Sequence, residues 1–174
     1  MFAKIYSKPN LKFKINTKLS FGSRIQVVKK KSSFYKFEKF WIQKKDLKKI
    51  NFRNRDVFND IKKFSGVKYK WGGKHFTGID CSGLVQVFFN YNNQYCPRDT
   101  KDQIKFFKKN VNIENIRKND LIFWKGHVAI AISKKKLIHA YGPFSKTVVM
   151  TIKNTVDRIY KTANLKVIGV RRTA

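Results

Sequence analysis

Cys81 is the residue whose type and surroundings most directly suggest chemistry. It lies in Gly78-Ile79-Asp80-Cys81-Ser82-Gly83, where small and turn-forming residues give way to an apolar pattern typical of a buried helix. The pattern predicts a helix over 81–91 with the thiol on its first turn. Unpaired backbone N–H groups at a helix start stabilise a thiolate, which attacks carbonyl carbons. Cys81 is therefore a candidate nucleophile, and the alternative is a small buried core residue.

Two of the three histidines, His127 and His139, lie in segments that are typical of strands, and their separation of 12 residues is even. With a hairpin loop of three residues, 133–135, His127 faces Tyr141, and His139 is a diagonal neighbour on the same face of the sheet. A two-residue loop would place the two rings on opposite faces. On one face, His127 can act as general base while His139 fixes its tautomer, as the third member of a triad does.

Two other interpretations of these residues stay open. The histidines could be hydrogen-bonded core residues, or Cys81, His127 and His139 could together bind zinc. Zinc sites commonly use a second Cys-x-x-Cys arm, which the other cysteine, Cys96, lacks. We therefore expect no metal and no other cofactor. His75 has no partner in the pattern and is expected in a loop.

The elements that must position these residues fall into two regions. Residues 2–49 form short β runs separated by Pro9, Gly22 and lysine clusters, a spacing that suits a small five-stranded barrel. The expected strands are 2–6, 11–15, 24–28, 33–37 and 40–42. The pattern changes between 50 and 54, so we expect one domain over 1–50 and another over 55–174.

The C-terminal region has the pattern of helices followed by strands. Apolar residues at helical spacing over 57–64 precede Gly66, a residue type that often ends helices. Further helices are expected over 81–91 and 100–108. The expected strands are 121–124, 127–133, 137–141, 147–152 and 167–171. This order predicts an α+β fold in which helices pack on an antiparallel sheet.

Composition narrows the class of protein. The chain has 174 residues, room for one domain and a small module, and its hydrophobic content of 42% is that of a globular protein. No apolar run reaches the roughly 18 residues of a membrane span, and the first residues lack the apolar region of a secretory signal. We therefore expect no membrane span and a cytoplasmic location, with a periplasmic or wall-associated one as the alternative.

Positive charge is spread along the whole chain. Forty Lys and Arg against ten Asp and Glu leave a net charge of +30, and residues 1–50 hold 15 basic and 2 acidic side chains. A diffusely positive surface attracts polyanions at low salt without a dedicated site. We expect no specific nucleic-acid partner, and the pattern leaves the oligomeric state open.

Several segments together resemble one known family. They are Tyr69-x-Trp71-Gly72-Gly73, Gly78-x-Asp80-Cys81-Ser82-Gly83-Leu84-Val85-Gln86, Pro97-Arg98-Asp99-Thr100-x-x-Gln103, Asp120-Leu121-Ile122-Phe123-Trp124, Gly126-His127-Val128-Ala129-Ile130 and Ile138-His139-Ala140. In this order and over roughly 55–174 they resemble the NlpC-type, papain-like cell-wall cysteine peptidases. One departure is Asn119, where relatives often carry glycine.

The resemblance implies a Cys-His-His peptidase without a cofactor that acts on bacterial peptidoglycan stem peptides. The bond implied is that between γ-D-glutamate and a diamino acid, expected to be meso-diaminopimelate, in small released murein peptides with a free N-terminal L-Ala. Cys81 is then the nucleophile, His127 the base and His139 the orienting residue. An amidase or acyltransferase on the same scaffold, or a non-catalytic wall-binding module, are the alternatives.

The resemblance also implies roles for residues around the nucleophile. Tyr69 matches a tyrosine whose hydroxyl assists the oxyanion, with a half-buried aromatic as the alternative. Asp80 and Ser82 match residues that hold the free α-amine of the substrate. Arg98 is expected to brace the following helix through Asp99 or Asp102. Trp71 and Trp124 are expected in the core or in the groove wall.

The first 50 residues loosely resemble a bacterial SH3 domain. In two-domain relatives of this kind, a tyrosine of the SH3 module closes the substrate pocket. Tyr6 is the candidate for that role, and packing inside the barrel is the alternative.

Overall fold

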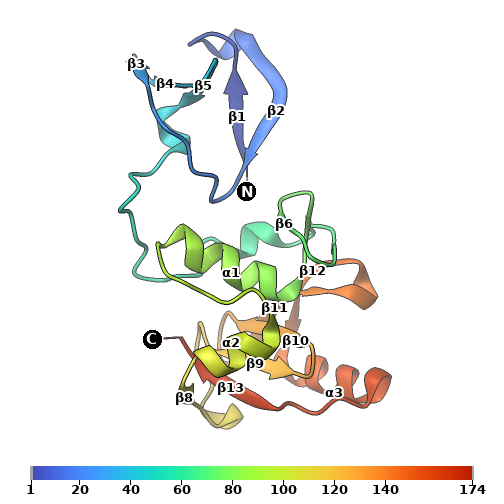
Figure 1. Cartoon of the computed structure of the whole chain (residues 1–174). Helices are drawn as coiled ribbons and strands as arrows, with labels where there is room; N and C mark the ends of the chain where they lie inside the picture. The colour runs from blue at the N-terminus through green and yellow to red at the C-terminus, as the bar shows by residue number, and fades with distance from the viewer. Residues whose placement is uncertain (1, 174) are drawn as a thin grey trace.

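The N-terminal region of the chain is a five-stranded antiparallel sheet at one end of an elongated molecule (Figure 1). The structure is a computed structural model, and it describes residues 2–173. In chain order the strands are β1 (Phe2–Tyr6), β2 (Lys14–Ser20), β3 (Lys29–Lys31), β4 (Phe34–Phe37) and β5 (Phe40–Gln43). They pair in the order β2-β1-β5-β4-β3. The small core of this sheet centres on Ile5, Phe37 and Ile42.

Two of the predicted N-terminal strands are placed differently. The segment 24–28 is not a strand, and β3 begins only at Lys29. Val28, with its side chain 61% exposed, makes a single backbone bond to the Lys36 carbonyl at 2.9 Å. Val27 and Val28 therefore have the intrinsic preference for a strand but, being exposed, lack the packing surface that makes it effective. The segment 11–15 begins as the 3₁₀ turn η1 (Leu11–Phe13), and the strand follows it.

The C-terminal region is built around a six-stranded antiparallel sheet in the order β12-β11-β10-β9-β13-β8. These strands are β8 (Lys109–Asn110), β9 (Leu121–Trp124), β10 (His127–Ala131), β11 (Lys136–Tyr141), β12 (Lys146–Thr151) and β13 (Gly169–Arg172). The helices are α1 (Cys81–Tyr91), α2 (Thr100–Phe106) and α3 (Ile152–Ala163). The short strands β6 (Lys74–His75) and β7 (Gly78–Ile79) form a separate hairpin. The predicted α+β class is confirmed.

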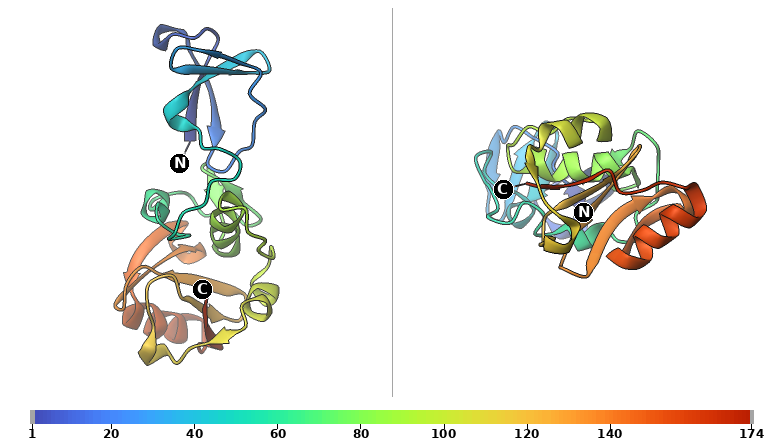
Figure 2. Two further views of the ribbon diagram at one scale, coloured as in Figure 1. Left: turned by 90° about the vertical axis from the view of Figure 1, so that its left-hand side faces the viewer. Right: turned by 90° about the horizontal axis from the view of Figure 1, so that it is seen from below.

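Helices cover both faces of this sheet, as Figure 2 shows in the view from below. Successive strand residues point to opposite faces, so the sheet contributes to two cores. Val128 and Ile138 pack with residues of α1 in one core. Trp124, Ala129 and Tyr141 lie in the other core with the apolar side of α3.

Helix α3 is absent from the sequence prediction, which passes from a strand ending at 152 to a strand beginning at 167. The hydroxyl of Thr151 caps α3 by accepting the Asn154 N–H at 3.2 Å, and the helix ends at Asn164 with φ 53. Its buried residues Ile152, Thr155 and Ile159 recur at spacings of three and four. Cap and spacing were both readable in the sequence. In contrast, the helical spacing over 57–64 yields only the 3₁₀ turn η3 (Ile61–Phe64).

The register of the hairpin β10–β11 is the one that a three-residue loop predicts. Ile130 pairs with Ile138, and the Ile132 N–H donates to the Lys136 carbonyl at 2.9 Å. This register places His127 opposite Tyr141, with His139 two residues away on the same face. On the other side of β10, His127 pairs with Trp124 of β9.

Asn119 shows why the departure from glycine is tolerated. It has φ 74, in the left-handed region that favours glycine and that asparagine enters more readily than most residues. Its side-chain amide donates to Asp56 Oδ1 at 2.9 Å. The neighbouring carboxylate of Asp120 is buried and paired with Arg172 on β13, which ties the end of the chain to the sheet.

Aromatic and polar contacts join the two regions. Phe21 packs on Phe88 and Tyr91 of α1 with ring centroids 5.1 and 4.3 Å away, and Arg24 donates to Asn93 Oδ1 at 3.1 Å.

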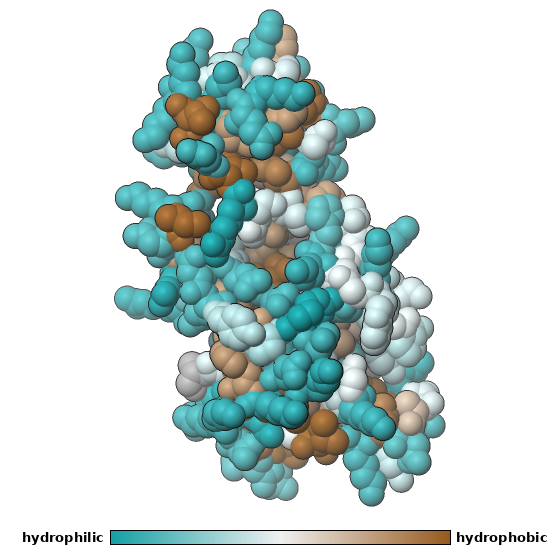
Figure 3. Space-filling model, in the orientation of Figure 1, coloured by the Kyte–Doolittle hydropathy of each residue, from teal (hydrophilic) through white to brown (hydrophobic). Residues whose placement is uncertain are grey.

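Figure 3 shows hydrophilic side chains over most of the visible face, with small separate hydrophobic patches. Over residues 2–173, no helix has the length and apolar character needed to cross a membrane.

Candidate active site

The thiol of Cys81 lies at the start of α1, as predicted. Asp80 is the N-cap residue, and its Oδ1 accepts the Gly83 N–H at 2.7 Å. Burial raises the pKa of the Cys81 thiol to about 11, against the backbone N–H groups of Val128, Ser82 and Cys81 itself, which lower it. The helix start acts in the expected direction, but burial outweighs it. The sulfur is therefore a protonated thiol in the resting site.

The two imidazoles meet directly, as the strand register predicts. His127 Nε2 lies 2.8 Å from His139 Nδ1, and the ring centroids are 5.1 Å apart. Burial lowers the pKa of His127 to about 4, and burial together with His127 lowers that of His139 to about 3. Both rings are therefore neutral at neutral pH. Since Nε2 of His127 is engaged, Nδ1 is the nitrogen that remains to accept a proton.

The backbone connects these two halves of the site. Val128, the residue after His127, packs in the same core as Cys81, and its backbone N–H lowers the pKa of the thiol. The first turn of α1 therefore abuts the start of β10, where His127 lies at the strand end. Because the thiol and the imidazoles are all neutral at rest, the arrangement favours general-base catalysis, in which the proton leaves sulfur as sulfur attacks. A preformed thiolate–imidazolium pair is disfavoured by burial.

Asp80 and Ser82 form a hydrogen-bond network with Arg98. The sequence predicted other partners for the Arg98 side chain. Arg98 Nη1 donates to Asp80 Oδ1 at 3.0 Å and to Ser82 Oγ at 2.8 Å, and Nη2 donates to Asp80 Oδ2. The Gly72 N–H also donates to Asp80 Oδ2, at 2.8 Å. The predicted bracing of α2 through Asp99 or Asp102 is therefore wrong. The buried carboxylate of Asp80 is the stronger partner because it has the greater need of a counter-charge.

Tyr69 lies beside the nucleophile. It is half-buried, packs against the core that contains Cys81, and forms a bridge with Ile79. Burial, then the neighbouring Cys81 and Asp80, raise the pKa of its hydroxyl. The hydroxyl is therefore protonated and close to the site, as an oxyanion donor has to be.

Tyr6 lies elsewhere. Its side chain is only 3% exposed and packs with Phe34 and Trp41 inside the N-terminal sheet. Phe2, at the other end of β1, is the residue of this strand that contacts the C-terminal region, through Phe76 with ring centroids 5.1 Å apart. This packing agrees with the alternative for Tyr6, a place inside the N-terminal module, and the role of closing the substrate pocket stays a prediction.

The tryptophans and the remaining histidine also have definite places. Trp71, in the loop before the nucleophile, is 81% exposed and belongs to neither core, so of the two expected places the core is wrong and the groove wall stays a prediction. Trp124 is buried beside His127, with ring centroids 5.7 Å apart. His75 is exposed on β6 and its Nδ1 lies 2.9 Å from the Thr77 hydroxyl.

Gln103 is a residue of the site region that sequence analysis did not assign. It is fully buried, and its Nε2 donates to the carbonyls of Ser82 at 3.0 Å and Pro97 at 2.9 Å. It thereby links α2 to the first turn of α1. A polar residue amid the helical pattern of 100–106 was the available signal, but its partners are remote in sequence.

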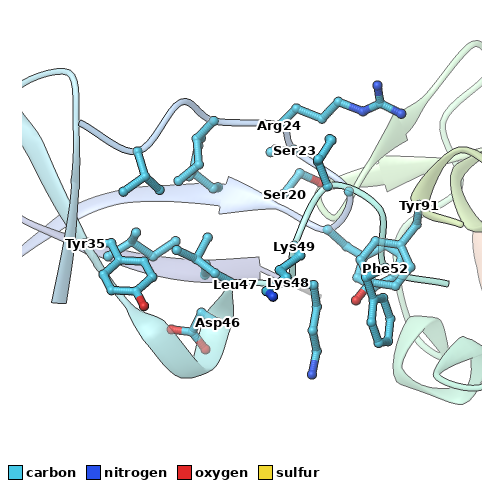
Figure 4. Close-up of a pocket in the computed structure, with 18 of the residues that line it drawn as sticks. Ser20, Ser23, Arg24, Tyr35, Asp46, Leu47, Lys48, Lys49, Phe52 and Tyr91 are labelled. Atoms are coloured by element: carbon cyan, nitrogen blue, oxygen red, sulfur yellow. The ribbon is translucent and has the colours of Figure 1, made fainter. Parts of the chain in front are cut away.

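A cavity between the two regions lies away from the nucleophile. It has a volume of about 590 Å³ and lies between the N-terminal sheet, the segment 44–52 and the C-terminal end of α1. Figure 4 shows Tyr35 and Asp46 at one end and Phe52 and Tyr91 at the other. None of the predicted site residues lines it. Since α1 starts at Cys81, cavity and thiol lie at opposite ends of the helix, about 15 Å apart along its axis.

Metal binding receives no support from the arrangement of the described residues. Across 2–173, no three His, Cys, Asp or Glu side chains are grouped so that they could hold an ion.

Comparison with known proteins identifies relatives over most of the C-terminal region. A family model described as the NlpC/P60 family matches residues 66–167. Dipeptidyl-peptidase 6 of Lysinibacillus sphaericus is 39% identical over 72 residues, 41% of this chain and 27% of the relative. Gamma-D-glutamyl-L-lysine dipeptidyl-peptidase of Bacillus cereus is 28% identical over 156 residues, 78% of this chain and 46% of the relative.

A solved structure extends the likeness to the N-terminal sheet. The crystal structure of an NlpC/P60 family protein from Bacillus cereus superimposes with a TM-score of 0.78 and 26% identity, covering 98% of this chain and 60% of that one. The chain spans between 27% and 52% of the length of three curated relatives. With the family model matching more than half of its residues around Cys81, His127 and His139, the chain belongs to the NlpC/P60 family.

Proposed function

We propose that this protein is a cysteine peptidase that hydrolyses the γ-D-glutamyl–diamino acid bond of small peptidoglycan stem peptides with a free N-terminal L-Ala. The observation that carries the proposal is the hydrogen bond between His127 and His139, with His127 next in the chain to Val128, which packs in one core with the helix-start Cys81. The names of the two relatives, a dipeptidyl-peptidase and a γ-D-glutamyl-L-lysine dipeptidyl-peptidase, support this bond type.

The chemistry follows from the geometry. The thiol proton of Cys81 passes to Nδ1 of His127 while sulfur bonds to the γ-carbonyl carbon of D-glutamate. The carbon–nitrogen bond then breaks, and the leaving amine takes the proton from His127. Water attacks the thioester with His127 again as base, which releases the acid and restores the thiol. The Cys81 N–H and the Tyr69 hydroxyl are the proposed donors to the oxyanion.

The preference for a free amine rests on Asp80 and Ser82. Each already accepts from Arg98, and Asp80 also accepts two backbone N–H groups. An incoming ammonium must therefore share or replace an Arg98 contact, which only a cation can do without leaving the carboxylate partly unpaired. An N-acetylated peptide lacks that charge and is expected to be a poor substrate.

The test uses the purified full chain with defined peptides and product masses. L-Ala-γ-D-Glu-meso-diaminopimelate and its L-lysine counterpart should release L-Ala-D-Glu, and Cys81→Ala should release none. Release of ammonia or transfer to an added alcohol would indicate the amidase or acyltransferase alternative. Equal turnover of free and N-acetylated peptides would contradict the free-amine preference while leaving the peptidase intact.

A further inference from the structure

The proposed proton transfer places a positive charge on a buried ring. In a Ser-His-Asp triad, a carboxylate accepts a hydrogen bond from the histidine and stabilises its imidazolium form. Here the third member is His139, a neutral ring. Within residues 2–173 the only hydrogen bond of either imidazole is the one between them, and the buried Nε2 of His139 has no partner. The charge therefore needs another source of stabilisation.

Two aromatic side chains lie against these rings. Tyr141 stacks on His139 with centroids 4.7 Å apart and an interplanar angle of 14°, and it lies 5.7 Å from the centroid of His127. Trp124 lies 5.7 Å from His127 on the side of β9. A cation over the face of an aromatic ring and within about 6 Å of its centroid is attracted by the ring quadrupole, more strongly where water is excluded. Both aromatic residues are buried.

The backbone holds this arrangement in place. Trp124 is the cross-strand partner of His127, and Tyr141 follows His139 by two residues on β11, so the four side chains share one face of the sheet. Phe144 meets Tyr141 edge-on at 5.3 Å and 89°. Lys146 of β12 pairs with Tyr141 along the backbone. It is a cation and supplies no negative charge to the resting rings.

We propose that Trp124 and Tyr141 are positioning residues that form an aromatic frame around the histidine pair. The frame sets the ring planes and stabilises the imidazolium that forms when His127 takes the thiol proton, the role that a carboxylate has in other triads. The inference rests on the proposed peptidase chemistry at His127, but it is independent of which peptide bond is cut.

The test weakens the negative charge on the face of the aromatic ring at position 141 step by step while keeping the shape of the side chain. Tyr141→Phe is the starting point and should keep at least half of kcat because the ring is retained. Replacing that phenylalanine by mono-, di- and trifluorophenylalanine weakens the quadrupole stepwise. We expect log kcat to fall with each fluorine, by about 2- to 30-fold over the series, with KM unchanged. The imidazole pKa values, followed by NMR, should fall in the same order because the cation loses stabilisation.

The matched control is the same series at Phe144, which contacts Tyr141 but neither imidazole. There we expect no trend. Constant kcat and constant imidazole pKa values along the series at 141 would overturn the aromatic frame. The NMR titration keeps the two proposals apart: a chain that cuts no peptide refutes the proposed function, whereas its imidazole pKa values still support or overturn the frame.

Discussion

The two regions of the molecule use their residues in opposite ways. Residues 1–50, which contain the N-terminal sheet, hold 15 basic and 2 acidic side chains. The main core cluster of this sheet has three buried members, Ile5, Phe37 and Ile42. In the C-terminal region, a large core on each face encloses the sheet. All four ion pairs found within 2–173 belong to that C-terminal region.

This difference shows where burial can be used for chemistry. The dry core of the C-terminal region shifts the pKa values of Cys81, His127 and His139 and can hold the charged pair of Asp80 and Arg98. The N-terminal sheet has a cavity of about 590 Å³ along its inner side and leaves most of its lysines exposed. The N-terminal sheet offers a surface that can bind or orient a ligand, whereas the C-terminal region holds the groups that can react with a substrate. The following experiments test that division.

The largest effect is expected at the nucleophile. Cys81→Ala should reduce peptide hydrolysis by about a thousandfold or more, because no other group can form the thioester. Tyr6→Phe in the N-terminal sheet should change kcat less than about twofold, since Tyr6 packs away from the site. Steady-state rates on the tripeptide measure both. A large loss in Tyr6→Phe with an unchanged circular dichroism spectrum would give the N-terminal sheet a role in the reaction.

The pH dependence is the next largest effect. His127 must be neutral to accept the thiol proton, and burial lowers its pKa to about 4. The acid limb of kcat/KM should therefore lie near pH 4, far below the value of about 6.5 for an exposed histidine. At the alkaline end, the thiol pKa of about 11 predicts no loss from Cys81 up to that pH. An acid limb near pH 6.5 would show that water reaches His127 in the resting site.

Core truncation compares the stability of the two regions. Ile42→Ala should lower the free energy of unfolding of the N-terminal sheet by about 3 kcal/mol, because Ile42 is 1% exposed and central to a small core. The kcat should stay within about twofold if the sheet only binds or orients. Urea unfolding followed by fluorescence, together with kcat of the same sample, gives both numbers. A parallel loss of kcat would show that the two regions act as one cooperative unit.

The smallest effect is expected at the ion pairs. Arg98→Ala should cost about 2 kcal/mol of stability, since it leaves the buried Asp80 carboxylate without its cation. Lys63→Ala, which removes an exposed pair with Asp60, should cost less than about 1 kcal/mol. Thermal or urea unfolding at neutral pH compares them. Equal costs would mean that Asp80 is less buried in solution than in the structure.

The places of the candidate catalytic residues could be predicted because their signals are local or simply periodic. The start of α1 at Cys81 follows from small and turn-forming residues before an apolar helical pattern, and the structure places it there. The even spacing of His127 and His139, with a three-residue loop, predicts the shared face that the 2.8 Å hydrogen bond confirms. The strand 24–28 was predicted by the same kind of local preference and is wrong, because strand formation depends on a packing partner.

The amino-acid sequence by itself determined the α+β order of elements, the helix that begins at the thiol and the face that the two histidines share, because caps and periodicity act over a few residues. Only the tertiary structure decided that Arg98 pairs with Asp80, that Tyr6 packs away from the site, and that Trp124 and Tyr141 enclose the imidazoles. Partner choice and desolvation arise when distant segments exclude water from one another, so a pattern along the chain does not contain them.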